Sequence, residues 1–341
     1  ACSQGVKNLW IINVGDIKPA EAEPQFAMEL AWDTDKWNPE NAYAFTEKWA
    51  AETFGTDVAP QIAQIKNEYY RLAQRGKPEH VFAIDYTVDE MDRRLADYER
   101  IAKMVDDVER SIHPRQSDAF FQLVEYPVKA AWQMNRKVFL AKKSLLEAKA
   151  GKRDLALRHA DEARSAYNEI KRLTDRYNTG ISSGKWNKMM SMNPRGLSQF
   201  DMPEVADKSM IASAESEIAD RQQSIYKGVN YIYASQGLKR IEGLGAAGSS
   251  LTQWPVSTSS YEERDLAEAP RATYRVKVKK GNNKISARFL PTFPLNGDYD
   301  LRTAVSIEGN KPKVISLKTT ASKGKWNENV VRGYNDATID Y

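Results

Sequence analysis

Three polar side chains near the start of the sequence have the types and spacing of a small binding site. Asn13, Asp16 and Lys18 lie at or just beyond the end of an apolar run, Leu9 to Val14, that has no polar alternation. Such a run predicts a strand covered on both faces. In α/β sheets and barrels, ligand-binding groups lie just past the carboxyl ends of such strands. We therefore expect a pocket here, although Asn13 and Asp16 could equally serve only to hydrogen-bond the backbone of the turn.

Other patterns that could carry chemistry are weak. The three histidines are far apart on different predicted elements and have no cysteine partners, so we expect no metal site. Gly243, Gly245 and Gly248 have the spacing of a nucleotide-binding loop, but a serine-rich segment and a proline follow in place of a helix. The sequence therefore predicts neither a metal nor a cofactor.

Composition excludes two classes of partner. The 341 residues are 41% hydrophobic and 28% charged, which is typical of a globular chain long enough for two domains. The net charge is only +4, and the lysines and arginines are interleaved with acids. No apolar run approaches the roughly 18 residues that cross a bilayer. We therefore expect no nucleic acid and no membrane as partners.

The middle of the chain predicts five amphipathic helices with clear start and stop residues. They are expected over residues 38–55, 57–76, 87–105, 114–149 and 154–177. Thr87 and Glu90 have the spacing of a capping box at the start of the third. Pro127 lies inside the fourth, where it predicts a kink. Because each helix must bury its apolar face, the five together predict a helical bundle.

A loop rich in glycine, serine and lysine is predicted over residues 180–196. It contains Trp186, Met189 and Met190, which are costly to leave in water. These side chains are expected either to pack on their own bundle or to reach into a neighbouring subunit. A further helix is predicted from Asp207 to Ile232.

The period of the sequence changes to two after Ser235. Residues 272–279 and 284–290 predict a hairpin, and residues 302–308 and 313–317 predict a second. Together they favour an antiparallel β-sandwich that lacks its last strands. Carbohydrate contact through Trp254, Tyr261 or Trp326 is a hypothesis for this region.

Five blocks of sequence resemble the later part of glycoside hydrolase family 115, the xylan α-glucuronidases. The blocks run in the family's order, and they are Trp10–Pro19, Asp118–Ala130, Gly184–Met190, Glu242–Ser250 and Phe289–Asn296. The resemblance implies a multidomain α+β fold made of the tail of a catalytic (α/β) barrel, an all-α bundle and a β-sandwich. The corresponding domains are residues 1–22 for the last barrel strand, 23–178 for the bundle, 179–234 for a loop and helix, and 235–341 for the sandwich.

The resemblance also implies a function. Family members release (4-O-methyl)glucuronic acid from xylan by inverting acid and base hydrolysis, so xylan or glucuronoxylan oligosaccharides are the expected substrates. It implies a homodimer, in which Lys185, Trp186 and Asn187 approach the partner's pocket, and a secreted or periplasmic location. Asn13, Asp16 and Lys18 would bind substrate.

Glycosidases need two carboxyl groups that flank the sugar bond. The spacing of the 46 acidic residues singles out no such pair. By resemblance, the catalytic acids are expected on earlier barrel strands outside this chain, so the chain alone should be inactive. The alternative is a non-catalytic module for dimerisation or polysaccharide binding.

Overall fold

The structure is a computed structural model of the whole chain. It describes residues 5, 8–38, 40–74, 76–208, 210, 229–234, 237–242, 244, 249–256, 258–276, 281, 284–292, 301–307, 310–317 and 323–340. The chain divides into two units. The first contains residues 1–73 and 91–218, and the second contains residues 74–90 and 219–341.

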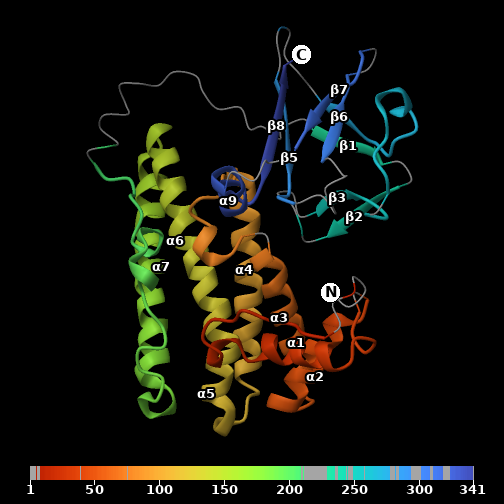
Figure 1. Ribbon diagram of the computed structural model, residues 1–341. Coiled ribbons are helices and arrows are strands. Elements are labelled where there is room, and N and C mark those ends of the chain that lie inside the picture. The colour runs from red at the N-terminus through yellow and green to blue at the C-terminus, as the bar shows by residue number, and fades with distance from the viewer. Residues whose placement is uncertain are drawn as a thin grey trace. The chain divides into compact units, whose positions relative to one another are not determined.

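Helices build the first unit (Figure 1). They are α1 Ala22–Trp32, α2 Ala42–Phe54, α3 Ala59–Gln74, α4 Val88–Glu109, α5 Ser117–Phe120, α6 Tyr126–Lys149 and α7 Arg153–Asp175. The five predicted helices are found, and α1 was not among them. Helices α6 and α7 run side by side along most of their length.

Local sequence explains where these helices begin and bend. The predicted capping box is present, because the Glu90 backbone N–H donates to Thr87 Oγ1 at 3.3 Å and the Thr87 N–H donates to Glu90 Oε2 at 2.7 Å. In place of a simple kink at Pro127, a π-helical turn over Phe121–Glu125 joins α5 to α6. Pro127 has no N–H for the Leu123 carbonyl, and the buried Lys66 ammonium lies 3.5 Å from that oxygen.

The core of this unit is apolar and rich in aromatic rings. Trp49 and Phe54 meet edge to face with ring centroids 5.9 Å apart, and Phe54 meets Phe120 in the same way. Ile62 and Tyr98 are completely buried beside them. The apolar stripes of the predicted helices therefore form core, as helices in water require.

The strand predicted at Leu9 to Val14 is not formed. These residues have no regular secondary structure, and Leu9 is 71% exposed and Ile11 is 86% exposed. A single strand leaves its backbone donors and acceptors unpaired, and the described residues of the first unit supply no strand beside it. Neither the predicted strand nor its burial is seen in this chain, and its place as the last strand of a barrel stays a prediction.

The described residues of the second unit form four antiparallel strand pairs. β1 Val229–Ala234 pairs with β4 Ala272–Val276, and β2 Leu238–Glu242 pairs with β3 Ser249–Gln253. β5 Lys284–Phe289 pairs with β8 Asn335–Asp340, and β6 Arg302–Val305 pairs with β7 Lys313–Ser316. Helix α9, Lys323–Arg332, precedes β8.

Strand positions were predicted better than strand partners. The hairpin of β6 and β7 is confirmed. The other predicted hairpin is wrong within the described residues, because β4 pairs with β1 and β5 pairs with β8. Most of the helix predicted from Asp207 to Ile232 lies outside the described residues, but its last four residues belong to β1 instead. Period alone does not choose a partner for a strand.

Residues 74–90 belong to the second unit although they lie between two bundle helices in sequence. The Arg288 guanidinium on β5 donates to the Asp85 carbonyl at 3.1 Å and lies 3.8 Å from the Glu90 carboxylate. The Ile84 side chain is buried and lies against Gly333. One arginine and one apolar contact thus attach the segment to the sheet region.

Candidate functional site

The predicted pocket residues divide into two groups in the structure. Asn13 and Asp16 are exposed on the extended segment. Lys18 is partly buried and begins a short 3₁₀ turn, Lys18–Ala20, that contacts the bundle. Its ammonium pairs with Glu21, and its carbonyl accepts a hydrogen bond of 3.3 Å from the Gln122 amide.

Lys18 meets the loop that was predicted separately as a contact for a partner subunit. The ammonium groups of Lys18 and Lys185 lie 5.4 Å and 4.9 Å from the centre of the Trp186 ring. Burial and the nearby Lys185 charge both lower the pKa of Lys18. Asn187 is exposed beside them. An indole flanked by two cations is suited to a sugar that carries a carboxylate.

Two π-helical turns support this cluster. The first is Phe121–Glu125, and the second, Arg176–Gly180, follows α7. The rings of Phe121 and Tyr177 lie 6.3 Å apart, and the Arg176 guanidinium lies 3.9 Å from the centre of the Phe121 ring. Burial raises the pKa of Tyr177 to about 12, so this phenol stays neutral. Such π turns occur frequently at functional sites.

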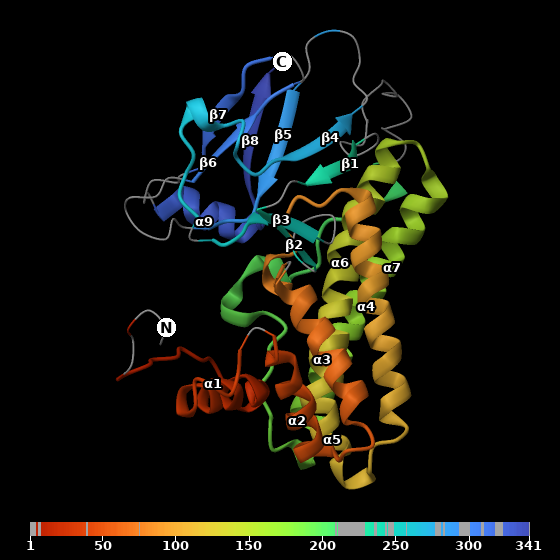
Figure 2. The same ribbon diagram turned by 90° about the vertical axis from the view of Figure 1, so that its right-hand side faces the viewer.

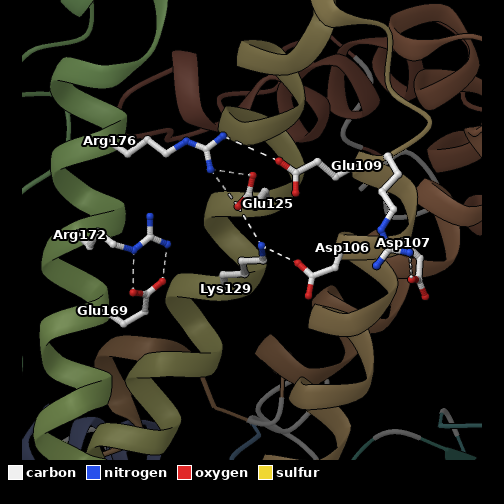
Figure 3. A network of polar contacts seen from close by, with 9 residues as sticks. Asp106, Asp107, Glu109, Glu125, Lys129, Glu169, Arg172 and Arg176 are labelled. Atoms are coloured by element: carbon white, nitrogen blue, oxygen red, sulfur yellow. Dashed lines mark hydrogen bonds and ion pairs between the residues drawn. The ribbon is translucent and has the colours of Figure 1, made fainter.

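A network of charges joins the two turns (Figure 3). The Glu125 carboxylate is only 2% exposed and accepts from Arg176 at 3.1 Å and from Lys129 at 2.9 Å. Lys129 also contacts Asp106 at 2.7 Å, and Arg176 lies 4.0 Å from Glu109. Although burial acts to lower the pKa of Lys129, its bonds to Asp106 and Glu125 raise it overall. The buried carboxylate is therefore fully paired, which suits a supporting group better than a proton donor.

The loop that carries Trp186 is attached to the bundle by side chains from its helices. The Asn178 amide donates to the Met190 carbonyl and accepts from the Met190 N–H, both at 2.9 Å. The Asp118 carboxylate accepts from the Ser182 N–H at 2.8 Å. Trp186, Met189 and Met190 pack against the buried Phe121 and Tyr177. The loop thus packs on its own bundle, one of the two outcomes expected from the sequence.

A buried lysine holds the far end of the same loop. Lys137 on α6 is completely buried, and its ammonium donates to the carbonyls of Phe200 at 2.8 Å and Asp201 at 2.9 Å, with Gln199 at 3.4 Å. Burial lowers the pKa of Lys137 to about 8. When Lys137 is protonated, its ammonium therefore has one N–H donor for each of the three carbonyl oxygens.

Sequence reasoning found the blocks but missed the residues that join them. Gln122 and Glu125 lie inside a block that resembles the family, yet their partners on other helices are not visible in sequence. Asn178 and Lys137 carry no sequence signal, because an amide or a lysine on a helix is usually solvated. A proline just after an apolar run was the available hint of an irregular turn.

In the second unit, the three aromatic residues proposed for carbohydrate contact differ in exposure. Trp254 is 50% exposed, and the Lys239 ammonium lies 4.2 Å from the centre of its ring. Tyr261 and Trp326 are each partly buried. The structure therefore singles out Trp254.

The described residues contain no group of three or more His, Cys, Asp or Glu side chains placed to hold a metal ion. Within the same residues, no helix has both the length and the apolar character that a bilayer crossing requires.

Comparisons with known proteins point in one direction. A family model described as "Glycosyl hydrolase family 115" matches residues 1–80, and one described as "Glycosyl hydrolase family 115 C-terminal domain" matches residues 233–341. A solved structure described as a novel family GH115 4-O-methyl-alpha-glucuronidase with specificity for decorated arabinogalactans is similar, with a TM-score of 0.72 and 28% identity. The similarity covers 100% of this chain, which spans 43% of that solved chain. No curated protein matches the sequence.

Proposed function

Since this chain belongs to glycoside hydrolase family 115, we propose that it forms part of an enzyme that removes (4-O-methyl)glucuronic acid side chains from a polysaccharide. One observation carries the proposal: family models match both ends, and the whole chain resembles a 4-O-methyl-α-glucuronidase. In this proposal the chain supplies one edge of the pocket together with a helical bundle and a β-sandwich. The reaction is an inverting hydrolysis, with one carboxyl as acid and another as base on water.

The catalytic carboxyl groups are proposed to lie in the part of the enzyme that this chain does not span. The exposed apolar segment at Leu9 to Val14 supports this proposal, because several large apolar side chains in water indicate a missing contact surface. We propose that it becomes the last strand of a catalytic barrel. Asn13, Asp16 and Lys18 would then face the sugar, with Asn13 donating to a hydroxyl or the carboxylate.

The Trp186 loop is proposed to border the same pocket. Lys18 and Lys185 flank its indole, and their charges favour a uronic acid over a neutral sugar. The alternative proposal is a homodimer in which Lys185, Trp186 and Asn187 reach the partner's pocket instead. A secreted or periplasmic location fits an enzyme whose substrate is an extracellular polymer.

Two polymer backbones are candidates. The family resemblance favours xylan, whereas the similar solved structure is described as specific for decorated arabinogalactans. The two differ in the sugars around the uronic acid, so the pocket for the acid itself could serve either.

The test measures release of 4-O-methylglucuronic acid from glucuronoxylan and from decorated arabinogalactan. The protein is used alone and as a chimera in which it replaces the corresponding part of a family 115 α-glucuronidase. We expect no release by the chain alone and release by the chimera, about tenfold slower in kcat/KM with Lys18→Gln.

Two outcomes contradict this proposal in different ways. Release by the chain alone contradicts the placement of the catalytic acids. A folded chimera that binds both polymers and releases no acid contradicts the hydrolase assignment and supports a polysaccharide-binding module. The thermal unfolding transition of the chimera shows whether it is folded.

A further inference from the structure

The hairpin of β2 and β3 holds an indole and a lysine side by side in the second unit. Strands β2 and β3 lie side by side (Figure 2). Lys239 is opposite Thr252 in their register, and Trp254 follows the end of β3. The backbone N–H of Trp254 donates to the Gly237 carbonyl at 2.9 Å. This bond joins the residue before β2 to the residue after β3. The Lys239 ammonium lies 4.2 Å from the centre of the indole.

The base of this hairpin leaves little freedom. Gly237 has a φ of +93°, and a Cβ atom there would lie 2.8 Å from the Pro270 Cγ. Glycine is therefore needed at this position for both its backbone angle and its size. The Pro270 ring thus lies close against the backbone of Gly237, at the base of the hairpin.

The surface around the pair is apolar and exposed. Trp254 is 50% exposed and Val256, two residues on, is 55% exposed. Lys239 and its neighbour Arg240 are exposed on β2. An indole is among the most costly side chains to leave in water, and its face matches the C–H face of a pyranose ring.

The charge of the C-terminal part of the chain, residues 233–341, favours an acidic ligand. Residues 233–341 contain 17 Lys and Arg against 11 Asp and Glu, a net charge of +6, whereas the whole chain has +4. Residues 1–232 therefore carry a net charge of −2. The excess of positive charge lies in the part of the chain that carries the exposed indole, so an acidic polymer would be attracted there.

We propose that Trp254 and Lys239 form a binding site for a polysaccharide that carries uronic acid groups. The indole packs on the apolar face of a sugar unit, and the ammonium pairs with a carboxylate on that unit or the next. The polymer class rests on the proposed function, but the site itself needs no hydrolysis. Val256 extends the apolar contact along the chain of sugars.

The test is the binding of the full chain to two soluble probes, glucuronoxylan and a xylan freed of its uronic acids, by isothermal titration. We expect Trp254→Ala to weaken binding to both polymers about tenfold. Trp254→Phe keeps an aromatic ring and should retain most of the affinity. Lys239→Gln should weaken binding to glucuronoxylan alone and reduce its dependence on salt.

Trp32→Ala is the matched control, because this tryptophan is 93% exposed and lies on α1 in the first unit. Unchanged binding by Trp254→Ala, or an equal loss in Trp32→Ala, would overturn the proposal. An equal loss on both polymers in Lys239→Gln would overturn the assigned role of the carboxylate. Isothermal titration measures binding without hydrolysis. A loss of this binding site is therefore distinguishable from a chimera that fails to release the acid.

Discussion

Two irregular segments of the first unit, residues 9–17 and residues 181–206, have opposite fates although both carry large apolar side chains. In the first segment Leu9, Ile11 and Ile17 are exposed. In the second, Trp186 packs on buried rings, and the backbone is hydrogen-bonded to side chains of the bundle. The difference lies in the contacts that each segment makes with the bundle. Apolar content alone does not bury a segment, and the second segment also has side-chain hydrogen bonds to its backbone and a packed surface beneath it.

The anchors of the second segment are polar and wholly or partly buried, which makes each of them costly to remove. Lys137 serves three carbonyls, Asn178 serves both backbone groups of Met190, and the Ser144 hydroxyl accepts from the Ala206 N–H at 3.1 Å. These side chains replace the ladder that a strand would provide. The comparison predicts that removing an anchor makes residues 181–206 behave like residues 9–17.

Lys137→Met should have the largest effect. It removes the donor that the carbonyls of Phe200 and Asp201 share, from a completely buried side chain, and we expect the free energy of unfolding to fall by about 3 kcal/mol. Denaturant unfolding measures the change. Lys185→Met is the control, because it makes the same change at a lysine of the loop that is exposed. Its loss should lower the free energy of unfolding by less than about 0.5 kcal/mol. Equal effects of the two variants would contradict an anchoring role for Lys137.

The same variant has a pH signature. The pKa of Lys137 is lowered from 10.5 to about 8 by burial. Between these pH values the unfolded chain keeps a proton that the folded chain has released, so the unfolding free energy contributed by this group rises with pH. The stability difference between wild type and Lys137→Met should therefore grow from about pH 7 to about pH 10. A difference that shrinks over this range would contradict the lowered pKa.

Asn178→Ala should have the next largest effect. It removes two hydrogen bonds from Met190, and we expect a loss of about 2 kcal/mol. Hydrogen exchange should become faster in residues 186–190, whereas residues 9–17 should exchange rapidly before and after the change. Asn187→Ala, an exposed amide in the same loop, is the control. Unchanged protection of residues 186–190 in Asn178→Ala would show that the apolar contacts alone hold the loop.

The comparison also shows which features are readable from a sequence. The bundle helices were predictable because their caps and periodicity are local, as in the capping box of Thr87 and Glu90. The contact of Lys18 with Trp186 and the hydrogen bonds of Lys137 to three carbonyls were not predictable. They join residues far apart in sequence through side chains that are usually solvated. The surroundings of the apolar run at Leu9 to Val14 were not readable for the same reason. Its hydrophobicity is local, but its burial depends on a partner.

The smallest effect is expected in the first segment, and it tests the comparison from the other side. Ile11 is 86% exposed and Ile62 on α3 is completely buried, so the two isoleucines form a matched pair. Ile62→Ala should lower the free energy of unfolding by about 3 kcal/mol, because it leaves a cavity in the core. Ile11→Ala should change it by less than about 0.5 kcal/mol in this chain. In the chimera that supplies the proposed barrel, the cost of Ile11→Ala should rise towards that of Ile62→Ala, because the side chain would then be buried. A cost that stays near zero in a folded chimera would mean that residues 9–14 remain in water there as well, and the proposed barrel strand would have to be abandoned.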